Sequence, residues 1–100
     1  MLQVSVTGRH FDVTDAIRDH AEEKIGKLRN HFDRLHAADL VLELEHERIR
    51  AELTVTAPHS KPLFAKADDR DLYAAVDAVV HRMERQIDRL KDRRRDHRSE

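Results

Sequence analysis

One hundred residues without cysteine or tryptophan suffice for a single domain with a modest core, and they offer no disulfide and no thiolate metal ligand. The formal net charge is only −1 although 39% of the residues are charged, so any electrostatic role depends on where the charges lie. No apolar run approaches the ~18 residues of a membrane span, and the N-terminus begins as a strand rather than as an export signal. We therefore expect a soluble, cytoplasmic protein with no membrane partner.

A short strand and a helix open the chain. Apolar and polar residues alternate from Leu2 to Thr7, which predicts a half-buried strand. Thr14 is a favourable N-cap, and we expect the helix that follows it to end near Asn30 or His31. Apolar residues recur along this segment at helical spacing and predict its buried stripe: Ile17, Ala21, Ile25, Leu28 and Phe32.

Basic residues border that stripe on both sides. Lys24 and Lys27 lie on one side, near His20 and His31, whereas Arg18 lies on the other. Lysine and arginine are mostly exposed in any soluble protein, so these residues alone are weak evidence of a site.

Three strand-like segments follow the first helix. Apolar and polar residues alternate over residues 40–45, 49–56 and 63–68. The first two segments predict a hairpin that turns at about His46-Glu47-Arg48. Two prolines between residues 58 and 62 predict a loop before the third segment, because proline has no backbone N–H to donate to a sheet.

A long helix is expected from Asp69 to Lys91. Its apolar residues trace one face: Leu72, Val76, Val79, Met83, Ile87 and Leu90. On the remaining surface, the two signs of charge are segregated. One flank carries Arg82, Arg85, Arg89 and Arg93, while the carboxylates lie further round, at Asp77, Glu84 and Asp88. A basic flank suits contacts with phosphates, and a solvated charged face explains the same pattern.

These elements predict an α+β fold with the order β-α-β-β-β-α. Because each strand has one apolar and one polar side, we expect a four-stranded sheet with both helices packed on its apolar face. The two basic helix flanks would then share one surface. The opposite face of the sheet carries Glu43, Glu45 and Glu52, which would repel phosphate. Any nucleic-acid surface is therefore expected on the helical side.

The chain resembles the ribosome hibernation promoting factor and protein Y family over nearly its whole length. The resemblance rests on the β-α-β-β-β-α order and on motifs in matching order and spacing: Val6-Thr7-Gly8, Thr14-Asp15-Ala16-Ile17-Arg18, Lys24 to Leu28, Phe32-Asp33-Arg34 and Asp71-Leu72-Tyr73-Ala74-Ala75-Val76-Asp77. The family implies a fold akin to the double-stranded RNA-binding domain. It also implies a stress or stationary-phase factor that occupies the mRNA and tRNA channel of the small ribosomal subunit, at the A and P sites, and blocks translation by occupancy.

The resemblance also implies the site and the partners. Arg18, Lys24 and Lys27 match basic family positions, and Arg82, Arg85 and Arg89 supply basic character on the second helix, so these six are the predicted RNA-binding residues. The expected partners are the small subunit with its rRNA and, because the chain resembles the short form or an isolated N-terminal domain, a ribosome modulation factor. We expect residues 1–92 to form the ribosome-binding domain and residues 93–100 a short, flexible basic tail.

Two other functions remain open. The chain could act as a general double-stranded RNA-binding module away from ribosomes, or as a protein-interaction module that pairs a partner helix with Met83 to Leu90. An enzyme is not expected, because neither Ser5 nor Ser60 lies in a nucleophile motif, and no cofactor or small-molecule substrate is implied. The eight histidines are scattered, with no pair at the i, i+4 spacing of a helical zinc site, so no metal site is expected.

Overall fold

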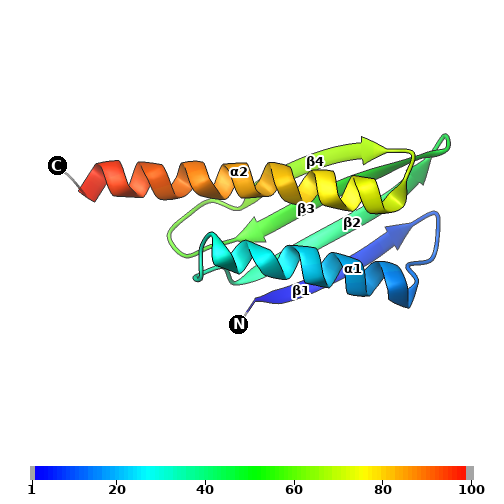
Figure 1. The fold of residues 1–100 in the computed structure, drawn as a ribbon, viewed down its shortest axis with the longest axis horizontal. Coiled ribbons are helices and arrows are strands. Elements are labelled where there is room, and N and C mark those ends of the chain that lie inside the picture. Colours follow the sequence, from blue (N-terminus) through cyan, green and yellow to red (C-terminus); the bar gives the residue numbers. More distant parts are fainter. Residues whose placement is uncertain (1, 99–100) are drawn as a thin grey trace.

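The computed structural model describes residues 2–98, with side chains described up to Asp92. The predicted β-α-β-β-β-α order is confirmed (Figure 1). The elements are β1 (Gln3–Arg9), α1 (Asp15–Gly26), the 3₁₀ helix η1 (Lys27–Asn30), β2 (Ala37–Glu45), β3 (Arg48–Thr56), β4 (Leu63–Asp69) and α2 (Leu72–Arg98). Neither helix within the described residues is long and apolar enough to cross a membrane.

The strands form one mixed sheet in the order β1-β2-β3-β4. β1 pairs parallel to β2, whereas β2 with β3 and β3 with β4 are antiparallel. Both helices cover the same face of the sheet, as Figure 1 shows, and the core lies between the two layers. The predicted alternation is confirmed at its centre, where Leu40, Leu42 and Leu53 are fully buried. The expected likeness to the double-stranded RNA-binding domain stays a prediction.

The β2–β3 hairpin turns through two residues, His46 and Glu47, and Glu45 lies opposite Arg48. Both turn residues have positive φ, 52° and 65°, which is the conformation of a tight hairpin turn. Asn-Gly is the usual sequence at such a turn, so the tertiary pairing of long strands holds two ordinary residues in a left-handed conformation.

Helix α1 begins as the sequence predicts. The backbone N–H of Ile17 donates to the Thr14 hydroxyl at 3.2 Å, so Thr14 is the N-cap. The α-helical part ends at Gly26, and η1 carries the chain on to Asn30. The predicted stripe is buried through Leu28, but Phe32 at its end is only half-buried.

Helix α2 begins later and ends later than expected. Asp69 is still part of β4, and the Asp71 carboxylate accepts from the backbone N–H of Ala74 at 3.3 Å, so the helix starts after Asp71. It then runs to Arg98 rather than ending near Lys91. Residues 93–98 of the predicted tail are thus helical, their side chains and residues 99–100 lie outside the described part, and the flexibility of the tail stays a prediction.

The apolar face of α2 packs mainly on the sheet and partly against α1. Met83 and Ile87 are fully buried and Leu90 is 9% exposed. The alternative in which the segment from Met83 to Leu90 pairs with a partner helix stays a prediction, but such a contact would have to use the exposed residues of the segment, because its apolar residues already form part of the core.

Candidate nucleic-acid interface

The helical side of the molecule places the six predicted RNA-binding residues in three separate positions. Helix α1 contacts β1, while α2 lies mainly over β3 and β4. One flank of α1 therefore lies toward β1 and the other toward α2, while one flank of α2 lies toward α1 and the other toward β4.

Arg18 lies at the outer edge of the sheet, on the β1 side. Its guanidinium Nη1 donates to the backbone carbonyl of Val6 at 3.3 Å, and the residue is exposed. Since guanidinium has five N–H donors, this bond fixes the orientation of the group and leaves other donors for an external acceptor.

Lys24 and Lys27 lie on the other side of α1, toward α2. Lys24 is half-buried and lies one turn beyond His20, whose ring contacts Asp77 of α2. The Lys27 ammonium lies 3.8 Å from the Glu23 carboxylate, in an exposed pair one turn apart along the helix. Pairs of this kind contribute at most about 0.5 kcal/mol, so Lys27 remains available to a stronger anion.

The two helices are joined by two histidine–aspartate pairs. His20 Nε2 lies 2.8 Å from Asp77 Oδ1, and His31 Nδ1 lies 3.0 Å from Asp88 Oδ1. The partners in each pair are 57 residues apart, so the helices run in the same direction and the pairs repeat after about three turns. The rings of His20 and Tyr73 form a T-shaped contact, with their centroids 4.9 Å apart.

Glu84 lies between these pairs, with its Oε2 4.0 Å from His31 Nε2 and 3.8 Å from His81 Nδ1. The flank of α2 that faces α1 is therefore acidic. Among the side chains of residues 2–92, no group of three histidine, aspartate or glutamate residues is arranged to hold a metal ion.

The arginine flank of α2 points the other way, toward β4. Arg82 Nη1 donates to the backbone carbonyl of Lys66, and Gln86 Nε2 donates to that of Phe64, each at 2.5 Å. Arg89 follows Arg82 by two turns on the same flank, and Arg85 lies between the two flanks on the exposed crest of the helix.

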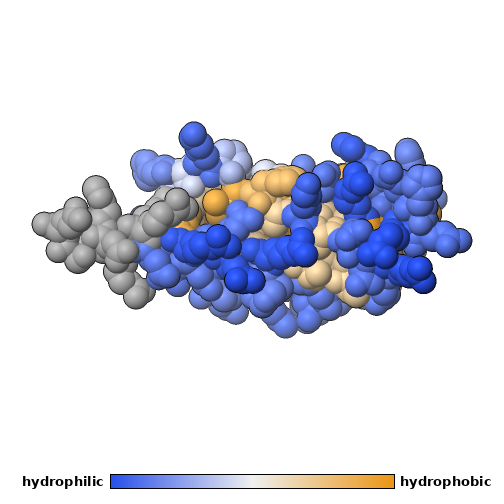
Figure 2. Space-filling model, turned by 90° about the horizontal axis from the view of Figure 1, so that it is seen from above, coloured by the Kyte–Doolittle hydropathy of each residue, from blue (hydrophilic) through white to orange (hydrophobic). Residues whose placement is uncertain are grey.

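The two basic flanks lie on the same helical side of the molecule (Figure 1) but do not adjoin, and the expectation that they form one RNA-binding surface stays a prediction. Lys24 and Lys27 face α2 across its acidic row, at Asp77, Glu84 and Asp88, while Arg82 and Arg89 lie beyond the crest. The physical reason is that the apolar stripe of α2 packs against the sheet, so one flank, the carboxylates, lies beside α1 and the other, the arginines, lies beside β4. Figure 2, seen from the α2 and β4 side, shows mostly hydrophilic side chains around a smaller apolar area.

The opposite face of the sheet is less acidic than the sequence suggested. Arg50 lies 3.9 Å from Glu43 and 3.7 Å from Glu45, so the carboxylates of β2 are matched by a cation on β3. Arg48 donates to Asp68 at 3.0 Å. This hydrogen bond and, next, the positive charge of Arg48 lower the pKa of Asp68 below its ordinary value.

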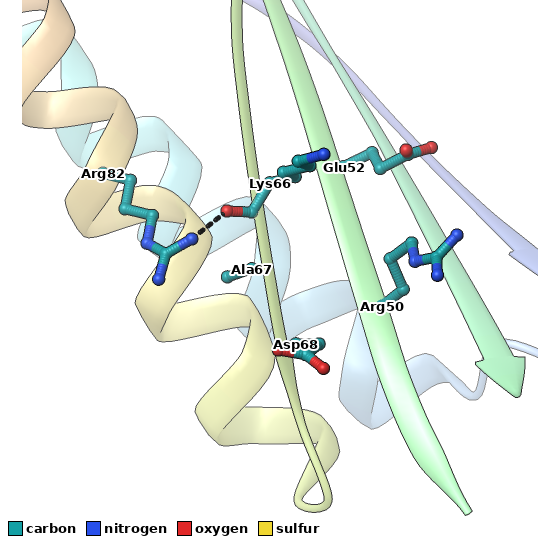
Figure 3. A pocket seen from close by; sticks show the side chains of 6 residues that line it. All are labelled: Arg50, Glu52, Lys66, Ala67, Asp68 and Arg82. Atoms are coloured by element: carbon teal, nitrogen blue, oxygen red, sulfur yellow. Dashed lines mark hydrogen bonds between the residues drawn. The ribbon is translucent and has the colours of Figure 1, made fainter. Parts of the chain in front are cut away.

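A shallow hollow of about 310 Å³ reaches from this outer face around β4 to α2 (Figure 3). It is lined by three cationic and two acidic side chains together with Ala67: Arg50, Lys66, Arg82, Glu52 and Asp68. Arg48 and Arg50 are counter-charges of this face that the sequence did not predict, although both occupy polar positions in the alternating pattern of β3.

A mixed four-stranded sheet with two parallel helices on one face, and with cations spread over the helical side, defines a small α+β domain suited to contacts with a polyanion. The family described as "Sigma 54 modulation protein / S30EA ribosomal protein" matches residues 4–95, and the chain belongs to this family. The predicted family resemblance is thus confirmed.

Similar proteins agree in sequence and in fold. A ribosome hibernation promoting factor from Azotobacter vinelandii is 35% identical over 92 residues, which span 92% of this chain and 85% of that protein. One from Acidithiobacillus ferridurans is 39% identical over 79 residues, 76% of this chain and 100% of that protein.

Two solved structures are also similar to this chain. The N-terminal domain of Thermus thermophilus Protein Y has a TM-score of 0.78 at 40% identity, covering 85% of this chain and 93% of that one. A ribosomal subunit interface protein from Coxiella burnetii has a TM-score of 0.84 at 24% identity, covering 92% and 99%, and supports the fold alone.

Proposed function

We propose that this chain is a ribosome hibernation factor that acts in the cytoplasm under stress or in stationary phase. It binds the small ribosomal subunit in the mRNA and tRNA channel, at the A and P sites, and blocks translation by occupancy, without catalysing a reaction. The observation that carries the proposal is membership of a family whose similar members are named ribosome hibernation promoting factors.

The distribution of cations on the helical side supports a contact with RNA backbone. Lysine and arginine bind phosphates through charge-assisted hydrogen bonds and release condensed counterions, so a small rigid domain gains affinity without reading bases. Arg85 and Arg89 are exposed and have no ion pair or hydrogen bond within the described residues. They are the readiest phosphate contacts, and Lys24, Lys27, Arg18 and Arg82 extend the contact on either side.

The acidic row between the helices restricts how RNA is held. Phosphates are repelled by Asp77 and Asp88, so the backbone strands approach the cations of α1 and the arginine flank of α2 as two separate contacts. Such an arrangement selects a binding surface by shape, since both contacts must be spanned at once.

The test is co-sedimentation of the purified protein with separated small and large ribosomal subunits at several salt concentrations, with initiator tRNA as competitor. We expect salt-sensitive retention on the small subunit, lost when tRNA is bound. Retention on both subunits and on duplex RNA, unaffected by tRNA, would instead favour the general double-stranded RNA-binding module. A lack of retention on either subunit would refute the proposal.

A further inference from the structure

The sheet has two open edges, at β1 and at β4. Alternate residues of an edge strand direct their N–H and C=O groups away from the sheet, where a further strand can pair with them. In β4 these residues include Phe64 and Lys66, because their carbonyls accept hydrogen bonds from outside the sheet. Unpaired edges of this kind are templates for association with another chain.

Side chains from the helices close both edges. Arg82 and Gln86, one turn apart on the same flank of α2, donate to the successive outward carbonyls of Lys66 and Phe64. On the other edge, Arg18 of α1 donates to the outward carbonyl of Val6. Each of these side chains occupies the space that a partner strand would need.

The β4 edge is suited to pairing with a second copy of itself. Strand β4 is seven residues long, and Phe64 on its outer face is 49% exposed. Two β4 strands can pair antiparallel with Lys66 of one copy opposite Asp68 of the other. The two-fold axis then generates a second, identical Lys66–Asp68 pair. The same register places Phe64 of each copy opposite Arg70 of the other, where a guanidinium can stack on the ring.

We propose that the β4 edge is a self-pairing surface for a second copy of this chain, and that Arg82 and Gln86 keep it closed. Pairing would join two sheets into one across the two-fold axis, and it requires both side chains to withdraw from the carbonyls that they cap. Each withdrawn hydrogen bond weakens self-association by about tenfold. Because the two-fold dimer opens both caps on each of its two copies, four bonds are withdrawn and self-association is weakened by about ten-thousandfold.

The experiment compares the wild-type chain with the Arg82→Ala/Gln86→Ala variant by sedimentation velocity over a concentration series. We expect the wild type to stay monomeric at concentrations where the variant dimerises, and the dissociation constant of the variant dimer to be lower than that of the wild type by about ten-thousandfold. The matched control is Arg89→Ala, which removes a cation from the same flank without uncapping β4. In sedimentation velocity this variant should stay monomeric at the same concentrations as the wild type.

A second substitution tests the edge itself. The N–H of Phe64 points outward and bonds no residue of β3, so Phe64→Pro in the uncapped variant removes a donor to the partner strand and leaves the β3–β4 ladder intact. We expect this triple variant to return to a monomer. We also expect the backbone N–H groups of Phe64, Lys66 and Asp68 to be protected from hydrogen exchange in the dimer only.

Two outcomes would overturn the proposal: an uncapped variant that is folded and monomeric at every concentration, or a dimer that persists with proline at position 64. If the double variant does not fold, Gln86→Ala alone is measured in the same way. A gain in association of about a hundredfold, from one cap lost on each copy, supports the proposal, and a monomer with unprotected amides in β4 refutes it.

Discussion

Replacing Arg85 and Arg89 by alanine should flatten the salt dependence of small-subunit binding while leaving the fold intact. Both side chains are exposed, and within the described residues neither forms an ion pair or hydrogen bond that stabilises the domain. Arg82 is different, because its bond to the Lys66 carbonyl also contributes to the fold. The Arg85/Arg89 pair therefore separates RNA binding from stability, which a variant that includes Arg82 would not do.

The magnitude follows from counterion release. Each phosphate contact contributes about 0.8 to the slope of log K against log salt, so six contacts give a slope near about −5 and four contacts a slope near about −3. Between about 50 and 200 mM salt, the wild type should lose about a thousandfold in affinity and the double variant about a hundredfold.

The assay is equilibrium binding of labelled protein to small subunits across this salt range, with circular dichroism to verify the fold. The matched control is Arg48→Ala, which removes an exposed arginine from the opposite face of the sheet and should leave the slope unchanged. A wild-type slope in the Arg85→Ala/Arg89→Ala variant would refute the assignment of these residues as phosphate contacts.

Three further predictions concern the fold. The Arg48→Gln change should raise the pKa of Asp68 toward its ordinary value, as measured by carboxyl-carbon NMR, because the hydrogen bond and the positive charge that lower it are lost. The stability linked to the lowered pKa is present above the pKa of the unfolded chain and disappears as pH falls through the pKa of the folded one. Gly8→Ala should lower the free energy of unfolding in urea by about 1–3 kcal/mol, since a Cβ would lie 2.6 Å from the Phe11 carbonyl oxygen. Gly26→Ala should raise it by about 0.5–1 kcal/mol, because a Cβ there meets open space. Equal effects of the two substitutions would contradict this reasoning. Ile25→Ala, at a fully buried site, should cost about 2–5 kcal/mol by the same measurement, and a loss below about 1 kcal/mol would mean that α1 does not pack as described.

Much of the fold follows from local patterns in the sequence. The alternation that buries Leu40 and Leu53, the cap at Thr14 and the helical stripe through Ile25 all depend on residues within a few positions of one another. The helix limits of α2 were predicted less well, because Asp69 and Asp71 both favour a helix start and only the pairing of Asp69 with Ile49 assigns it to β4.

The candidate site depended on contacts between distant parts of the chain. Helical spacing correctly separated the arginine flank of α2 from its carboxylate flank, but spacing within one helix does not state which flank faces a neighbour. The choice is made when the apolar stripe of α2 packs on the sheet beside α1, which brings the carboxylate flank to His20 and His31, 57 positions away. Arg82 then lies over β4, where it bonds a backbone carbonyl.

The sequence by itself thus determined the order of the elements, the buried face of each and, through its motifs, the family to which the chain belongs. Only the tertiary structure decided that an acidic row separates the basic flanks, that Arg48 and Arg50 offset the carboxylates of the sheet, and that Arg82 and Gln86 cap carbonyls of the β4 edge. The physical reason is the separation of the interacting residues along the chain. Burial patterns repeat every two to four residues, whereas these ion pairs and edge contacts join segments that only the folded sheet and helices bring together.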